Sequence, residues 1–143
     1  MESSVRSFFE RYERLFNRSL AGQADMAEVA ALYAPAFIAA SPAGVATGKN
    51  DAHFRQVMAE GYAHYQAIGT RDMRIRDIRL SPMDDHHCLA HVAWTATYER
   101  KDRSDIAIDF DVHYFAQMLD GEPKVFGWVS GDEQALLKQH GIA

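Results

Sequence analysis

A short stretch of the chain gathers residue types that bind metal ions. Residues 84–91 contain three histidines, one cysteine and two aspartates. A strand alternates its side chains between two faces, so only part of this set can act together. If the following hairpin pairs as expected, His91 lies opposite His113 with Asp111 nearby, and two imidazoles with a carboxylate could bind zinc or copper. The alternative is a sheet face used for dimerisation, in which these side chains hydrogen-bond across the interface.

Hydroxyl and imidazole groups offer a second kind of chemistry. Ser41 precedes Pro42 and could hydrogen-bond a ligand, or it could bond its own backbone in a turn. No histidine–aspartate pair lies near it in the sequence, so Ser41 lacks the partners of a nucleophile. Acid–base chemistry on an apolar molecule would use Tyr62 and Ser41, together with Tyr12 or His53. This set implies no cofactor.

Aromatic side chains form the largest group, because periodicity places most of them on inward faces. Each ring could simply fill the core, but together they could line the space that a curved sheet leaves open. An aromatic pocket with few charges suits a flat, apolar ligand. The expected ligand-binding residues are Phe16, Phe37, Phe54, Met58, Tyr62, Trp94, Tyr98, Phe110, Val112, Tyr114, Phe126 and Trp128.

The composition limits the classes of protein to consider. The 143 residues fit one domain over 1–143, and 48% hydrophobic residues are enough for a core. A formal net charge of −5 argues against binding to nucleic-acid phosphates. Cys88 is the only cysteine, so an intrachain disulfide is impossible. The N-terminus lacks the pattern of a signal peptide, and no apolar run reaches membrane-helix length, so we expect a cytoplasmic protein that does not bind membranes.

The elements that must position these residues can be read from periodicity. Residues 5–20 have one apolar helical face, and a second helix starts at Asp25 and runs to Tyr33, before Pro35. A short strand over 37–40 precedes a third helix, which Asn50 or Asp51 caps and which runs to Tyr65. The later segments alternate as strands. They cover residues 73–80 with a bulge, 88–99, 105–119 and 124–130, with a turn at Asp120-Gly121 and a tail helix capped by Asp132.

This order predicts an α+β fold. A strongly curved antiparallel sheet would wrap around three N-terminal helices as a cone-shaped α+β barrel, followed by a short C-terminal helix, because long half-polar strands need cover on one face. The pattern, including the segments 32–42 and 110–115, resembles the nuclear transport factor 2-like superfamily, with its SnoaL-like proteins and ketosteroid isomerases. The resemblance spans the whole chain. It implies a fold more firmly than an activity, since this superfamily hosts unrelated chemistries.

The resemblance also implies where a ketosteroid isomerase site would lie. The base of that family corresponds to Ser41, its oxyanion-hole tyrosine falls near Phe16, and its protonated acid falls near Phe110 or Val112. These residue types cannot abstract a proton or stabilise an enolate. Steroid isomerase chemistry is therefore not expected.

The outward sheet face and the pocket lead to the functional hypotheses. The resemblance favours a homodimer through the outward face, which is flat and partly apolar at Ala93, Thr95, Thr97, Ala107, Phe115 and Leu119. We expect a domain that binds a small apolar molecule. The alternatives are a lyase, isomerase or cyclase acting on an apolar metabolite, and a dimerisation or protein-interaction module, for which we would expect a closed core without a cavity.

Overall fold

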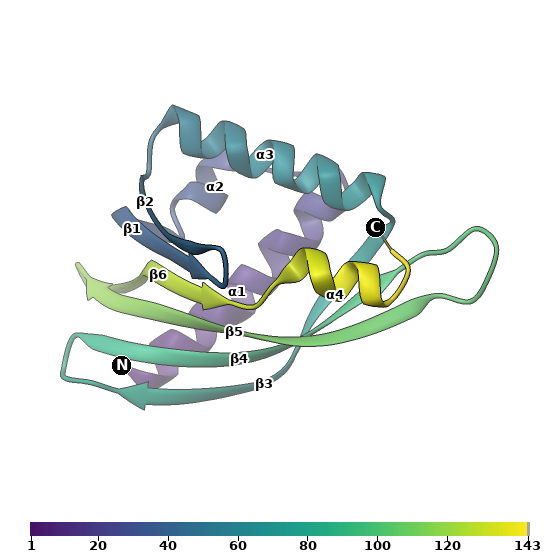
Figure 1. The fold of residues 1–143 in the computed structure, drawn as a ribbon. Coiled ribbons are helices and arrows are strands. Elements are labelled where there is room, and N and C mark those ends of the chain that lie inside the picture. Colours follow the sequence, from purple (N-terminus) through teal and green to yellow (C-terminus); the bar gives the residue numbers. More distant parts are fainter. Residues whose placement is uncertain (143) are drawn as a thin grey trace.

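The computed structural model describes residues 1–142, which form four helices and one six-stranded sheet (Figure 1). The helices are α1 (Glu2–Leu20), α2 (Met26–Ala30), α3 (Ala52–Ala67) and α4 (Glu133–Gln139). The strands are β1 (Tyr33–Ser41), β2 (Gly44–Lys49), β3 (Thr70–Pro82), β4 (His87–Tyr98), β5 (Ile106–Leu119) and β6 (Glu122–Ser130). The sheet order is β2-β1-β6-β5-β4-β3, and β1 pairs with β6 in parallel. The predicted α+β class with a curved, unclosed sheet is confirmed.

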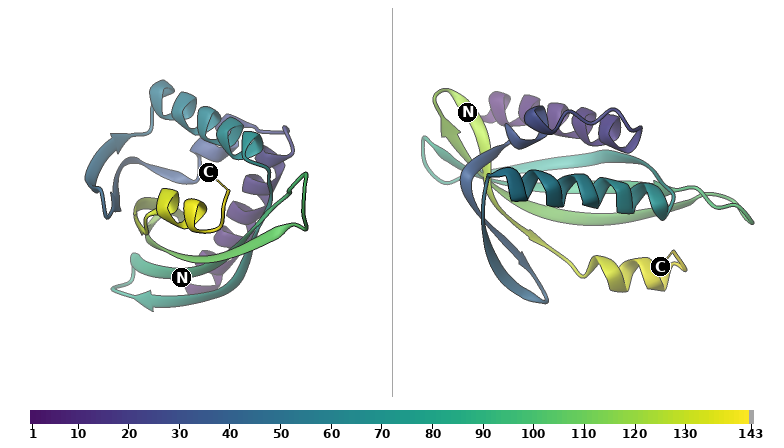
Figure 2. Two further views of the ribbon diagram at one scale, coloured as in Figure 1. Left: turned by 45° about the vertical axis from the view of Figure 1, so that its right-hand side comes forward. Right: turned by 90° about the horizontal axis from the view of Figure 1, so that it is seen from above.

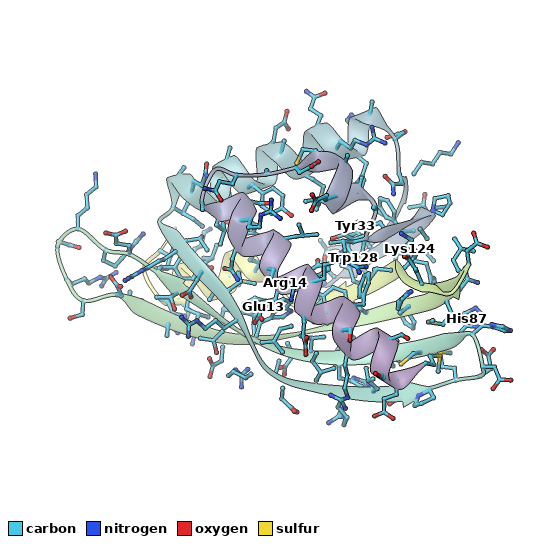
Figure 3. All side chains as sticks on the ribbon, turned by 180° about the vertical axis from the view of Figure 1, so that it is seen from behind. Glu13, Arg14, Tyr33, His87, Lys124 and Trp128 are labelled. Carbon is cyan, nitrogen blue, oxygen red and sulfur yellow. The ribbon has the colours of Figure 1, made fainter. Side chains whose placement is uncertain are left out.

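Helix α1 lies across the inner face of the sheet, behind it in Figure 1 and in front in Figure 3. Its apolar side chains recur every three or four residues, so Val5, Phe8 and Phe9 all point inward and are buried. Burying one such phenylalanine stabilises the fold by roughly 1.5–3 kcal/mol. None of the helices formed by residues 1–142 combines the length and apolar character that crossing a membrane requires.

The predicted helix starts are confirmed. The Asp25 carboxylate accepts hydrogen bonds from the first turn of α2, Asp51 accepts one from Phe54 N at 3.0 Å, and Asp132 accepts one from Ala135 N at 2.9 Å. Each carboxylate satisfies a backbone N–H that has no partner within its helix. The Asp132 cap therefore determines where α4 begins after β6.

The chain between α2 and α3 differs from the prediction. Helix α2 ends at Ala30 instead of Tyr33, and β1 begins at Tyr33 and runs through Pro35. The reason is pairing with a distant strand, since Val125 N donates to Leu32 O at 2.9 Å and Tyr33 pairs with Val125. Strand β2, which local alternation did not reveal, pairs antiparallel with β1.

The two long hairpins follow the predicted alternation, with one correction. His91 lies directly opposite His113, and the predicted bulge in β3 falls between Ile75 and Asp77. A second irregularity, between Phe115 and Ala116 of β5, shifts the register of β6. It turns Phe126 to the outer face, so the expected inward position of that ring is wrong.

Helix α1 also covers the open edge of the sheet. β3 is an edge strand, and the Asn17 amide donates to Met73 O and accepts from Met73 N, both at 2.8 Å. One turn earlier the Glu13 carboxylate accepts from Ile75 N, and Figure 3 shows Glu13 on α1 beside the sheet. Two side chains thus take the place of a neighbouring strand at Met73 and Ile75 and protect that part of the edge.

Candidate functional site

A cavity of about 650 Å³ lies between the helices and the concave face of the sheet. Helices α1 and α3 form one wall, β3 to β6 form the other, and α4 closes one side; Figure 2 shows α3 between α1 and α4 when seen from above. The volume is within the range of roughly 300–1,000 Å³ that small-molecule sites occupy. The interaction-module hypothesis required a closed core, which these walls do not form.

Exposure of the lining residues shows where the cavity opens. We call the buried group Tyr12, Tyr33, Trp94 and Tyr114 the floor; it draws on α1, β1, β4 and β5. The exposed lining residues form the rim, at Val57, Asp109, Asp111, Gly131, Asp132 and Glu133. The opening therefore faces solvent between α3, α4 and the segment of β5 that precedes its pairing with β6 at Val112.

The floor is a compact hydrogen-bonded group. The hydroxyls of Tyr12 and Tyr33 are 2.9 Å apart, and the Trp94 indole Nε1–H donates to the Tyr114 hydroxyl at 3.2 Å. The ring centroids of Tyr12 and Tyr114 are 5.5 Å apart. Figure 3 shows Tyr33 next to Trp128, with a ring separation of 5.7 Å. Polar atoms from four elements thus meet at the buried end of an apolar cavity.

The floor has more donor hydrogens than internal contacts. Trp94 and the three tyrosines carry one N–H and three O–H groups, and the two hydrogen bonds among them use two of these four hydrogens. At least one hydroxyl hydrogen is left for an acceptor that is not part of the floor. A buried donor without a partner costs about 1–3 kcal/mol, which a ligand or water in the cavity can offset.

Burial determines the protonation of these tyrosines. It raises the pKa of Tyr12, Tyr33 and Tyr114 above the usual value, because an ionised phenolate would lose its water. Higher in the cavity, burial raises the pKa of Tyr98 to about 12, and the Glu133 carboxylate adds to this shift. The hydroxyls therefore remain neutral donors and are unsuited to act as bases at neutral pH.

The carboxylates of the site all lie at the rim. Asp109 and Asp111 come from outward positions of β5, and their carboxylates lie 3.5 and 3.8 Å from the Arg76 guanidinium on the outer face. The Asp132 carboxylate caps α4. Glu133 lies beside Tyr65 of α3, where burial and the neighbouring carboxylate both raise the tyrosine pKa.

Most of the predicted ligand-binding residues line the cavity. They are Phe16, Met58, Tyr62, Trp94, Tyr98, Phe110, Val112, Tyr114 and Trp128. Phe37 and Phe54 form a second layer instead, with ring centroids 4.6 Å apart, and both pack against Tyr33. Phe126 contacts Phe115 and His87 on the outer face, away from the cavity.

The four catalytic candidates are divided by the fold. Tyr12 and Tyr62 line the cavity. Ser41 borders a shallower hollow between the β1–β2 hairpin and β6, and its hydroxyl accepts a hydrogen bond from Ala43 N at 3.2 Å. His53 is exposed on α3 and does not line the cavity. The two tyrosines are therefore the candidates that a ligand in the cavity can reach.

Sequence reasoning missed several residues of the site. Tyr33 was assigned to a helix end, and only its pairing with β6 turns the ring to the floor. Tyr65, expected only as the end of the third helix, also lines the cavity. The Gly131–Glu133 segment gave no apolar signal, since it reaches the rim through the path of the chain from β6 into α4.

The histidine pair lies outside the cavity, on the outer sheet face. His91 Nδ1 and His113 Nδ1 are 2.7 Å apart, so the expected cross-strand pair forms. Asp111 is engaged by Arg76, and within residues 1–142 no three His, Cys, Asp or Glu side chains gather where they could hold a metal ion. The three residues considered as an alternative metal site are thus not brought together.

Comparison with known proteins addresses the fold. The family described as NTF2-like protein (DUF6841) matches residues 2–133. No curated protein matches the sequence. An NTF2-like protein with a cystatin-like fold from Novosphingobium aromaticivorans has a TM-score of 0.71 at 10% identity, covering 99% of this chain and 87% of the other. An NTF2-like protein of unknown function from Shewanella oneidensis gives 0.67 at 11% identity, covering 92% and 98%.

A third solved structure is that of a ketosteroid isomerase-like protein from Erwinia carotovora atroseptica. Its TM-score is 0.63 at 16% identity, and the match covers 90% of this chain and 93% of the other. At these identities the likeness concerns the fold alone, so the chemistry of the cavity must be argued from its own residues.

Proposed function

The chain belongs to the family described as NTF2-like protein (DUF6841), and from that premise we propose that its cavity binds a flat, apolar molecule carrying a hydrogen-bond acceptor. The observation that supports this most directly is the surplus hydroxyl hydrogen of the floor. A ligand carbonyl, ether or hydroxyl oxygen placed there would satisfy that donor. The aromatic walls would bury the rest of the molecule.

The shape of the ligand follows from the walls. Phe16, Phe110 and Trp128 present ring faces or edges to the cavity, while Met58 offers an adaptable thioether. Burying apolar surface contributes about 25 cal/mol per Å². A two- or three-ring molecule would therefore gain more from these walls than a flexible polar one.

Binding is preferred over catalysis because the cavity offers donors without a base beside them. Tyr12, Tyr33 and Tyr114 stay neutral, and the carboxylates lie at the rim. A lyase, isomerase or cyclase is the second candidate, and the observation in its favour is Tyr12 itself. A buried neutral phenol can stabilise a developing oxyanion. Conversion of a bound ketone that is abolished in Tyr12→Phe would move this candidate ahead.

The binding proposal can be tested by filling the cavity. Gly61 on α3 lines the cavity, and a Cβ built there meets no atom within 4 Å. Gly61→Leu should project into the open space and weaken binding at least about tenfold, since the ligand must compete for the same volume. The matched control is Ala59→Leu, on the exposed side of the same helix. Titration calorimetry with 2-acetylnaphthalene measures both.

The floor is tested with a second pair of compounds. 2-Acetylnaphthalene carries a carbonyl, and 2-isopropylnaphthalene has a similar shape without it. We expect the ketone to bind about tenfold more tightly, because a hydrogen bond contributes about 0.5–1.5 kcal/mol. Equal binding of the two compounds, or equal weakening by both leucine variants, would contradict the proposal.

The proposal includes a homodimer formed through the outer sheet face. The tilted rings of Phe115 and Phe126 lie there with centroids 5.8 Å apart, beside Leu89 and the exposed Val129. Partly exposed aromatic rings on a sheet are typical of an interface. Phe115→Asp should convert the dimer to a monomer in sedimentation experiments, whereas Val45→Asp, on the exposed β1–β2 hairpin, should not. A monomeric wild-type chain at high concentration would exclude this assembly.

A further inference from the structure

The charged residues along the lining of the cavity are all acidic. They are Asp109, Asp111, Asp132 and Glu133, of which Asp109 and Asp111 occupy outward positions of β5, with their carboxylates directed to the outer face of the sheet. Among residues 1–142, no lysine, arginine or histidine takes part in it. Arg76 is the cation nearest to Asp109 and Asp111, and it pairs with them on the outer face of the sheet. A ligand in the cavity would therefore meet aromatic rings and, at the rim, the carboxylates at the start of α4, but no cationic partner.

This one-sided charge has a direct consequence for anionic molecules. An anion that leaves water for an apolar cavity loses hydration, and it recovers that loss only when a cation or several donors replace the water. The floor offers a surplus hydroxyl hydrogen but no positive charge. Carboxylates and phosphates are thus poor ligands for this cavity, whatever the shape of their apolar part.

Within the proposed binding function, we infer that the cavity selects a bipolar ligand: an acceptor oxygen at the floor and a protonated amine at the rim. The Glu133 carboxylate lies beside Tyr65 and raises its pKa, which places negative charge next to an aromatic ring. Phe16 packs on Tyr65 with a ring separation of 5.7 Å. An ammonium group there would meet both a carboxylate and ring faces, which attract cations.

Glu133 is the carboxylate best placed for this role. Asp132 already accepts the capping hydrogen bond from Ala135 N, and Asp109 and Asp111 face Arg76. The N-terminus of α4 offsets part of the negative charge of Asp132 and Glu133. Because Glu133 is exposed, its attraction for an ammonium is screened by solvent and is worth only about threefold in affinity. The net charge of −5 adds a general attraction for cations.

The test uses one flat body with three different outer groups. The compounds are 2-acetylnaphthalenes that carry an aminomethyl, hydroxymethyl or carboxylate group at the far ring position. We expect the amine to bind about threefold more tightly than the alcohol, and the carboxylate at least about tenfold more weakly than the alcohol. Added salt should weaken binding of the amine and leave binding of the alcohol unchanged.

Glu133→Gln provides the matched variant. It removes the charge but keeps the shape, and Asp132 still caps α4. The amine should lose its advantage of about threefold over the alcohol, while Glu10→Gln, an exposed position of α1 away from the cavity, should change nothing. A carboxylate that binds as tightly as the amine overturns the charge inference and leaves the binding proposal intact. If none of the three compounds binds, the binding proposal itself fails.

Discussion

At the scale of single residues, two pairs of side chains combine polar groups that each need a partner. The Tyr12 and Tyr33 hydroxyls meet at the floor of the cavity, and the His91 and His113 imidazoles meet on the outer sheet face. A hydrogen bond between two Nδ1 atoms requires one of them to be unprotonated. The histidine pair therefore depends on pH in the physiological range, unlike the tyrosine pair.

The lowered pKa of His91 predicts that the free energy of unfolding decreases in mild acid. Burial, Arg79 and His113 together lower the pKa of His91 below its usual value of about 6.5. As the pH falls through 6.5, the unfolded chain therefore takes up this proton before the folded chain does. Stability is fully present above about pH 6.5 and is lost as the pH falls toward the folded pKa.

NMR titration of the histidine ring signals checks this prediction. His113→Asn should move the pKa of His91 back toward its usual value, because a neighbouring positive charge is removed. His53→Asn, at an exposed position of α3, serves as the control. A His91 that titrates at or above about 6.5 in the wild-type chain would contradict the assigned environment.

At the scale of elements, helix α1 has two separate roles. Its apolar face supplies Tyr12 and Phe16 to the cavity, and its polar side closes the open edge of β3 through Asn17 and Glu13. The contacts of Asn17 and Glu13 with β3 fix the position of α1 along the sheet, and with it the position of the Tyr12 hydroxyl. Edge protection and the geometry of the floor are thus linked through one helix.

Asn17 variants should show how much this edge contact contributes. Asn17→Leu leaves the Met73 N–H and C=O without their partner, and we expect a loss of about 2–4 kcal/mol in the free energy of unfolding. Asn17→Asp keeps the acceptor for Met73 N, so its free energy of unfolding should lie between those of the wild type and the leucine variant. Urea unfolding measures all three chains. A leucine variant as stable as wild type would mean that water replaces the amide without cost.

The β1–β2 hairpin is fixed by close packing at one glycine. A Cβ at Gly48 would lie 2.4 Å from Phe37 Cε1, and that ring stacks on Trp128 at 5.3 Å. Gly48→Ala should therefore cost about 1–3 kcal/mol by overpacking. Thermal unfolding measures the loss, and adding Phe37→Leu should recover part of it. Simple addition of the two single effects would show that the two sites do not contact one another.

At the scale of the whole molecule, the curved sheet creates a cavity that draws all six tyrosines toward the interior. Burial is the first cause of a raised pKa for each of them, at Tyr12, Tyr33, Tyr62, Tyr65, Tyr98 and Tyr114. The fold thus keeps every phenol neutral across the range in which a free tyrosine would ionise. This has a consequence for stability in alkali.

The tyrosines predict cooperative unfolding in alkali. The unfolded chain releases these protons near pH 10, and the folded chain holds them to higher pH. The contribution of the tyrosines to stability should therefore be constant below about pH 10 and fall as the pH rises above it, because the unfolded state then binds fewer protons. Tyrosinate absorbance should rise together with the loss of the helical circular dichroism signal. A fraction of tyrosines that titrates near pH 10 in the folded chain would contradict this prediction.

Features that depend on residues close together in the chain could be predicted from the sequence. The aspartate caps of α2, α3 and α4 need only a backbone N–H two or three positions away. The alternation of β4 and β5 predicted the His91–His113 pairing, because a hairpin joins strands that are close in sequence. The one-sided apolar spacing of α1 predicted its buried face for the same local reason.

Contacts between residues far apart in the chain could be found only in the tertiary structure. The parallel pairing of β1 with β6 joins residues about 90 positions apart, and it converts Tyr33 from an expected helix end into the floor of the cavity. The bulge between β5 and β6 places Phe126 outside, because Phe126 is the extra residue between Val125 and Gly127, so that Phe126 and Trp128 no longer share a face. The path from β6 into α4 brings Glu133 to the rim. These outcomes depend on the free energy of long-range packing, which a local pattern of residues does not contain.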